Sequence, residues 1–170
     1  HQELNMVLDM NVAQNMFLGQ EPTQHGIINW DKIYSDTQKI LLQYGLDIDP
    51  RTPVRRLGIG VRQMIEIAKN LSIRNAEIVV MDEPTAALTF DEVEELFKLI
   101  ASLKKRGVSI IYISHRIEEV FRIGDCATVL RDGSTVGTVS LTDVTADDLI
   151  QMMIGHNISE FFPKQNAPSS

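Results

Sequence analysis

The chain has 170 residues, of which 44% are hydrophobic, and it carries a net charge of −7 at pH 7. This length and composition predict a globular protein with a core of its own, and the acidic balance argues against nucleic acid as a partner. With Cys126 as its single cysteine the chain cannot form an internal disulfide, and no apolar run approaches the ~20 residues of a membrane span. The first residues, HQELNMVLDM, lack the features of a signal peptide and do not begin with Met, so we expect a fragment or a processed protein.

The first part of the chain, up to about residue 75, is predicted to be helical. Apolar residues recur there at helical spacing, and Gly19 and Gly45 end two of the periodic segments, as glycine often does at a helix C-terminus. The predicted helices are NVAQNMFLG (11–19), NWDKIYSDTQKILLQYGL (29–46) and VRQMIEIAKNLSI (61–73).

After residue 76 the pattern changes to two strands separated by a helix. EIVVMD (77–82) and VSIIYIS (108–114) are apolar runs of strand length, which predict parallel strands buried on both faces. The intervening segment, 90–106, has helical spacing, and Thr89 and Glu92 form a capping box at its start.

The C-terminal part is predicted to contain a short helix, a hairpin that turns at Asp132–Gly133, and a second capped helix that ends at Gly155. The elements together predict an α/β protein with a parallel sheet. Its predicted parts are a helical subdomain (1–75), an α/β core with a C-terminal hairpin and helix (76–156), and a linker or tail (157–170).

Polar residues follow both predicted parallel strands. Asp82 and Glu83 end the first strand, and Ser114 and His115 end the second. Ligands of open parallel sheets bind beyond the carboxyl ends of the strands, so we expect these residues to line one crevice. Asp82 suits Mg²⁺, Glu83 could orient or deprotonate a water, and His115 could donate a hydrogen bond to a phosphate oxygen. The alternative is that both acids only end a strand at a turn closed by Pro84.

Gly58 and Gly60 open the third predicted helix, within RRLGIGVRQMIEIAKNL. Glycines allow a ligand to approach the backbone closely, and a helix N-terminus offers free N–H groups to an anion. The alternative here is an ordinary joint between a loop and a helix.

Five segments, in this order and spacing, resemble the ATP-binding domain of ABC transporters, which implies a P-loop NTPase-like fold. Longer stretches such as RQMIEIAKNLS and DEPTAALT resemble the first of the two ATPase halves in monosaccharide importers of the ribose, galactose and xylose type. The five segments are HQEL (1–4) at the Q-loop, LGIGV (57–61) at the signature sequence, VVMDEP (79–84) at Walker B, AALT (86–89) at the D-loop and ISHR (113–116) at the switch histidine.

The resemblance implies roles for these residues in ATP hydrolysis. Asp82 holds Mg²⁺ through water, Glu83 activates the attacking water, and His115 binds the γ-phosphate. Gln2 senses Mg²⁺ and the transmembrane partner. The implied partners are a membrane permease, a second ATP-binding half and, indirectly, a periplasmic or extracellular sugar-binding protein, with no nucleic acid. The implied location is the cytoplasmic face of the cell membrane, where the domain is peripheral.

The sequence departs from the family pattern in two places. The phosphate-binding P-loop requires a glycine followed by Lys, and no glycine of this chain is followed by Lys. We therefore expect the chain to be the C-terminal two-thirds of an ATP-binding half, and to bind ATP weakly or not at all on its own. Gly58 and Val61 replace the Ser and the final Gln of the signature sequence LSGGQ. In the family each signature serves the nucleotide of the opposite half, so the resemblance predicts two unequal sites, with the first half's nucleotide hydrolysed faster.

Two alternatives to a sugar-importing ATPase stay open. Without a P-loop the chain could be a catalytically inactive docking module for a permease or a partner half. It could also be an ABC-type ATPase of another process, such as DNA repair or translation, although the acidic charge argues against this.

Overall fold

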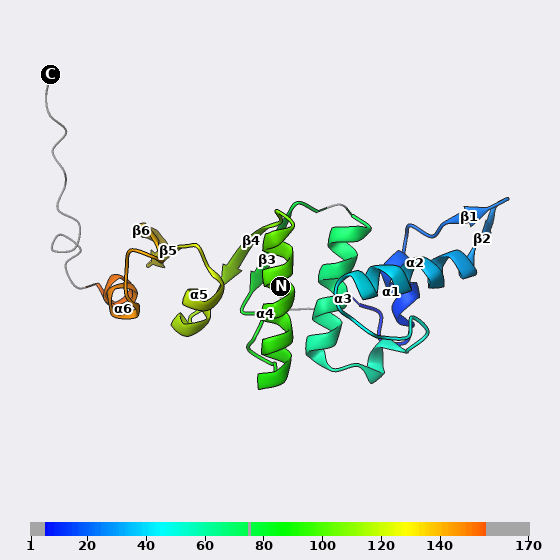
Figure 1. The fold of residues 1–170 in the computed structure, drawn as a ribbon, viewed down its shortest axis with the longest axis horizontal. Helices are drawn as coiled ribbons and strands as arrows, with labels where there is room; N and C mark the ends of the chain where they lie inside the picture. Colours follow the sequence, from blue (N-terminus) through cyan, green and yellow to red (C-terminus); the bar gives the residue numbers. More distant parts are fainter. Residues whose placement is uncertain (1–5, 75, 156–170) are drawn as a thin grey trace, which may run out of the picture. The chain divides into compact units, whose positions relative to one another are not determined.

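The computed structural model describes residues 6–74 and 76–155. The chain divides into two compact units, His1–Ile113 and Ser114–Ser170, each with its own packing. Figure 1 shows the elements of both units. The first unit contains α1 (Val12–Phe17), β1 (Thr23–Gln24), β2 (Ile27–Ile28), α2 (Trp30–Gln43), a 3-10 helix (Val54–Arg56), α3 (Ile59–Ser72), β3 (Ile78–Asp82), α4 (Phe90–Lys105) and β4 (Ser109–Ile113). The second unit contains α5 (Ile117–Ile123), β5 (Cys126–Arg131), β6 (Ser134–Ser140) and α6 (Ala146–Ile154).

The three helices predicted in the first part of the chain are confirmed as α1, α2 and α3, which pack against one another. Met16, Ile33 and Ile65, one from each helix, have no exposed surface. Lys69 of α3 donates a hydrogen bond to the carbonyl of Asn15 in α1 at 2.6 Å. The strands β1 and β2 form a short antiparallel pair that the helical pattern had not predicted.

The strands β3 and β4 pair in parallel, with Asp82 opposite Ile113 at their carboxyl ends. The prediction that both faces of these strands are buried is wrong for one face. Met81 is 4% exposed, whereas Val80 is 61% exposed, because neighbouring strand residues point to opposite faces. The described part of this sheet has two strands, and α4 packs against β4.

The helix α4 begins at the capping box that the sequence predicted. The Thr89 hydroxyl accepts a hydrogen bond from the Glu92 N–H, and the Glu92 carboxylate accepts one from the Thr89 N–H. Leu96, Ile100 and Leu103 are at most 1% exposed and fix the inner face of the helix. This helix also packs against α3 (Figure 1), so it joins the sheet to the helical part of the first unit.

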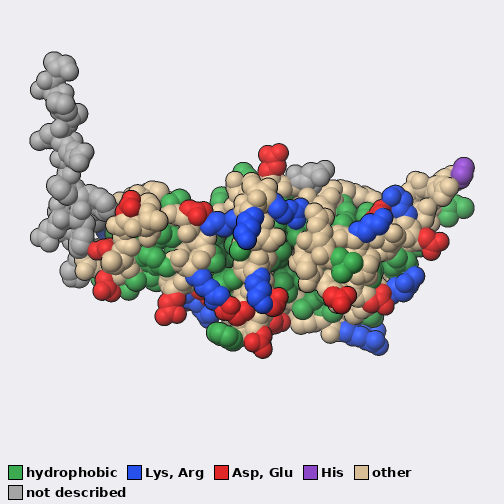
Figure 2. Space-filling model, in the orientation of Figure 1, with side chains coloured by type: hydrophobic (Ala, Val, Ile, Leu, Met, Phe, Trp, Pro, Cys, Tyr) green, Lys and Arg blue, Asp and Glu red, His purple; other side chains and the backbone are tan. Residues whose placement is uncertain are grey.

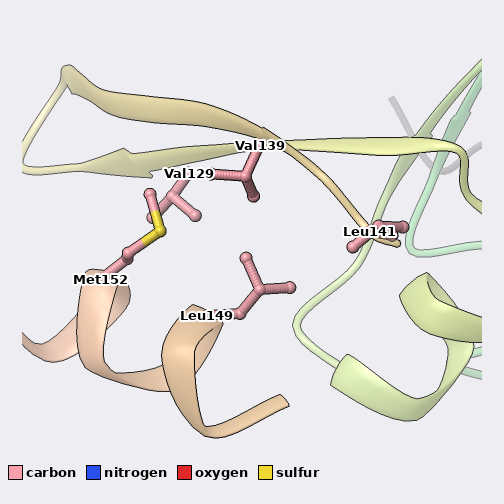
Figure 3. Packing of buried hydrophobic residues seen from close by; sticks show 5 residues of the cluster. All are labelled: Val129, Val139, Leu141, Leu149 and Met152. Atoms are coloured by element: carbon pink, nitrogen blue, oxygen red, sulfur yellow. The ribbon is translucent and has the colours of Figure 1, made fainter. Parts of the chain in front are cut away.

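In the second unit, α6 packs against the β5–β6 hairpin (Figure 3). The predicted turn is confirmed: Asp132 and Gly133 have φ values of 52° and 75°, the left-handed conformation of a two-residue hairpin turn. Val129 and Val139 of the hairpin point toward Leu149 and Met152 of α6, and all four are at most 9% exposed. The predicted cap of α6 is also present, since the Thr145 hydroxyl accepts from the Asp148 N–H.

On the face seen in Figure 2, acidic and basic side chains both occur, with hydrophobic side chains between them. Among the helices of residues 6–74 and 76–155, none is both long and apolar enough to cross a membrane.

Candidate functional site

The two acids of the predicted crevice lie at the carboxyl end of β3. Asp82 is the last residue of the strand and is exposed, and Glu83 follows it and is half-buried. The Glu83 N–H donates to the carbonyl of Ile113 in β4 at 2.9 Å. This bond extends the parallel pairing by one residue and fixes the backbone of Glu83 at the sheet edge.

Glu83 has a left-handed backbone, with φ 46°. This conformation costs a residue with a side chain roughly 1–2 kcal/mol, and such strain is found where a site depends on an exact backbone direction. Turns on its C-terminal side hold it in place: the Ala86 N–H donates to the Glu83 carbonyl at 3.1 Å, and the Leu88 N–H donates to the Thr85 carbonyl at 3.2 Å. The chain then enters the cap of α4, so the position of Glu83 is set from both sides.

The glycines of the second predicted site surround a carboxylate of this chain. Gly58 is the N-cap residue of α3, and the Gly60 N–H donates to Glu92 Oε1 at 3.3 Å. A Cβ atom on Gly58 would lie 2.8 Å from Glu92 Oε1, and one on Gly60 would lie 2.9 Å from both Cβ and Cδ of Glu92. Both glycines are therefore needed for Glu92 to reach the start of α3.

Glu92 thus links the starts of two helices. Its Oε2 accepts from the Thr89 N–H and from the Thr89 hydroxyl, both at 3.0 Å, while Oε1 accepts from Gly60. Three hydrogen bonds hold the pKa of the Glu92 carboxyl below its ordinary value. The bond from the Thr89 N–H contributes most, and the bonds from the Thr89 hydroxyl and the Gly60 N–H add to it. The capping pattern predicted the bond to Thr89, but no sequence pattern links Glu92 to a glycine 32 residues away.

Ser114 and His115 begin the second unit, directly after β4. His115 is exposed, whereas Ser114 is half-buried. The Ser114 hydroxyl accepts from the Arg116 N–H at 3.0 Å and donates to Glu119 Oε2 at 3.3 Å. The turn around His115 is therefore tied to the helix that follows it, α5.

The structure brings together Asp82 and Glu83 at one strand end, and Gly58 and Gly60 around Glu92. Glu83 belongs to the first unit and His115 to the second, so the expectation that they line one crevice stays a prediction. Gln2 lies outside the described residues.

The sequence predicted a magnesium site at Asp82, and this stays a prediction. Over residues 6–74 and 76–155 no group of three or more His, Cys, Asp or Glu side chains could hold a metal ion. An exposed single carboxylate fits Mg²⁺ when the remaining ligands are waters and phosphate oxygens, which is how proteins commonly bind this ion beside nucleotides.

The fold is that of an ABC ATPase, as the sequence predicted. CbiO1 from Clostridium perfringens, part of an ABC transporter complex, matches with a TM-score of 0.69 at 24% identity, over 86% of this chain and 57% of that one. A dimeric ATP-binding cassette in a post-hydrolysis state with ADP and Pi matches with a TM-score of 0.63 at 20% identity, over 83% of this chain and 61% of that one. No protein-family model matches the chain.

The sequence relatives are ATP-binding proteins of sugar import. The xylose import protein XylG of Moorella thermoacetica is 49% identical over 166 residues, 98% of this chain and 33% of the relative. The galactose/methyl galactoside import protein MglA of Escherichia coli is 48% identical over 169 residues, 99% of this chain and 33% of the relative. The predicted resemblance to sugar-importer ATP-binding proteins is confirmed, and the chain spans about a third of the length of these relatives.

Proposed function

We propose that the chain is part of an ABC-type ATPase that drives the uptake of a monosaccharide through a membrane permease. The observation that carries the proposal is Glu83, held in a left-handed backbone at the carboxyl end of β3 beside Asp82. The relatives support it, since their names describe ATP-binding proteins of xylose and galactose import. In this proposal, residues 1–75 form a helical subdomain, 76–156 form the α/β core, and 157–170 lead to a second ATP-binding half.

The proposed reaction is hydrolysis of the γ-phosphate of ATP. Asp82 would hold Mg²⁺ through water, and the ion would neutralise charge on the phosphate oxygens. Glu83 accepts a proton from a water whose oxygen bonds to the γ-phosphorus. The bond from that phosphorus to the bridging oxygen breaks, which leaves ADP and phosphate. His115 donates a hydrogen bond to a phosphate oxygen, and Gln2 would sense Mg²⁺ and the transmembrane partner. Positioning and charge neutralisation supply most of the catalysis in such transfers.

The signature segment has a different role. In this proposal, Gly58 and Gly60 face the nucleotide of the opposite ATP-binding half, so the complete enzyme contains two halves. The sugar-binding protein acts outside the membrane, and this domain lies on the cytoplasmic face against the permease.

A hybrid protein tests the proposal. Residues 1–170 replace the matching region of the Escherichia coli galactose/methyl galactoside import protein, which is 48% identical over 169 residues. We expect the hybrid to hydrolyse ATP, and Glu83→Gln to lower kcat by about 100-fold or more, the scale of a lost general base. Glu95→Gln is the matched control, because Glu95 is an exposed glutamate of α4.

A folded hybrid that hydrolyses ATP equally well with and without Glu83→Gln would contradict the proposed role of Glu83. A folded hybrid with no hydrolysis would instead favour the inactive docking module.

A further inference from the structure

Glu119 carries the single charged side chain that is buried among residues 6–74 and 76–155, with 7% of its surface exposed. Taking a carboxylate out of water is unfavourable unless hydrogen bonds and opposite charges compensate it. Glu118, its neighbour on α5, is exposed. The position of Glu119 in the interior therefore requires specific partners.

Two partners of Glu119 lie on either side of His115 in the chain. Oε2 accepts from the Ser114 hydroxyl at 3.3 Å, and Oε1 accepts from Arg116 Nη1 at 3.2 Å. The Arg116 side chain is half exposed, so water partly screens its attraction to the Glu119 carboxylate.

Hydrogen bonds from two backbone N–H groups close the same turn. The Arg116 N–H donates to the Ser114 hydroxyl at 3.0 Å, and the Glu119 N–H donates to the Arg116 carbonyl at 3.1 Å. The residues before and after His115 are thus bound to each other and to one carboxylate. All these bonds lie within the second unit, so the arrangement does not depend on where the first unit lies.

We propose that Glu119 is a positioning residue for His115. By holding Ser114 with one oxygen and Arg116 with the other, it fixes the backbone direction from which the exposed His115 side chain projects. The proposal rests on the proposed function, in which His115 contacts a phosphate oxygen. This positioning limits the directions available to the His115 imidazole before the nucleotide arrives, since preorganised donors need little rearrangement during reaction.

A purely structural role is the competing explanation. Glu119 lies in the first turn of α5, where any acid interacts favourably with the helix dipole. That role predicts a loss of stability over the whole second unit, with no special effect at His115. The two explanations therefore differ in where the effect of a substitution appears.

Amide hydrogen exchange and NMR on the 170-residue chain separate them. Glu119→Gln keeps the side-chain length but removes the charge, and its NH₂ group cannot accept a hydrogen bond. The Arg116 amide donates to the Ser114 hydroxyl, which itself donates to Glu119. We therefore expect this amide to exchange about tenfold faster, the scale of one lost hydrogen bond to a charged group, and the His115 backbone and ring signals to shift. The paired amides of the β5–β6 hairpin should keep their exchange rates. Glu118→Gln, the matched control, should change none of these.

Two results would overturn the proposal. One is an unchanged Ser114–Arg116 turn in Glu119→Gln. The other is an equal rise in exchange across the hairpin and the turn, which would assign Glu119 to general stability. Because this measurement involves no nucleotide, it decides the role of Glu119 even if the hybrid protein hydrolyses no ATP.

The hybrid adds a kinetic test. If it is active, we expect Glu119→Gln to lower kcat with little change in KM, and to have no further effect in a His115→Ala background. Additive losses in the double variant would mean that Glu119 acts independently of His115, which would also overturn the proposal.

Discussion

Gly60→Ala would place a methyl group against Glu92, at 2.9 Å from both its Cβ and its Cδ. The Cβ atom of Glu92 is fixed to the backbone of α4, so the clash is relieved only if α3 and α4 separate or Glu92 leaves its position. Overpacking of this kind costs ~1–3 kcal/mol, and each lost hydrogen bond of the carboxylate costs about 1 kcal/mol more. Alanine regains at most ~1 kcal/mol over glycine in a helix. The expected net loss in the free energy of unfolding is about 2 kcal/mol.

Gly58→Ala is the matched control for this substitution. Its new methyl group would approach only Glu92 Oε1, at 2.8 Å, and that atom is the far end of a flexible side chain. We expect a loss below about 1 kcal/mol, because Glu92 can rotate away and give up only its bond to Gly60.

Urea unfolding followed by the fluorescence of Trp30 measures both variants, because Trp30 is the single tryptophan and lies on α2 in the first unit. The midpoint should fall more for Gly60→Ala than for Gly58→Ala, with an unchanged slope. Equal stability of Gly60→Ala and the unmodified chain, or an equal loss in both variants, would refute the reasoning from the contacts of Glu92.

Three further predictions concern other contacts. Because the pKa of Glu92 is lowered, its ionised form stabilises the fold fully above the ordinary pKa of 4.5 and less as the pH falls below it. The difference in free energy of unfolding between the unmodified chain and Glu92→Gln should therefore narrow on acidification. A constant difference would contradict this. Leu149 is 2% exposed, so Leu149→Ala should lower the free energy of unfolding of the second unit by ~2–5 kcal/mol. Faster hydrogen exchange in the β5–β6 hairpin would show this loss, and unchanged exchange would refute it. The asymmetry predicted from Gly58 and Val61 means that the first half's nucleotide should be hydrolysed faster in the complete transporter, and equal turnover at the two sites would contradict it.

Local chemistry accounts for the elements that the sequence predicted well. The capping box of Thr89 and Glu92, and the Asp132–Gly133 turn, depend on residues within a few positions of each other, so their pattern is visible in the chain. The pairing of β3 with β4 followed from two apolar runs separated by a helix. These same signals placed Asp82 and Glu83 at a strand end.

Contacts between distant residues explain what the sequence did not predict. An apolar run shows that a strand is hydrophobic, but the elements that pack on it decide which faces are buried, so the 61% exposure of Val80 was missed. The bond from Gly60 to Glu92 joins residues far apart in the chain. Glu119 offered a weak signal: it is a charged residue among the apolar positions of RIEEVFRIG, yet nothing in that pattern distinguishes it from Glu118.

Under the proposed function, the left-handed backbone of Glu83 places a cost in stability at the same position as a role in activity. Glycine and asparagine adopt φ 46° with less strain than glutamate does, so Glu83→Asn should relieve part of the backbone strain while losing the carboxylate. A library of variants selected only for thermal resistance should therefore discard this glutamate early. Under the proposed function, glutamate stands at position 83 because the reaction requires its carboxylate.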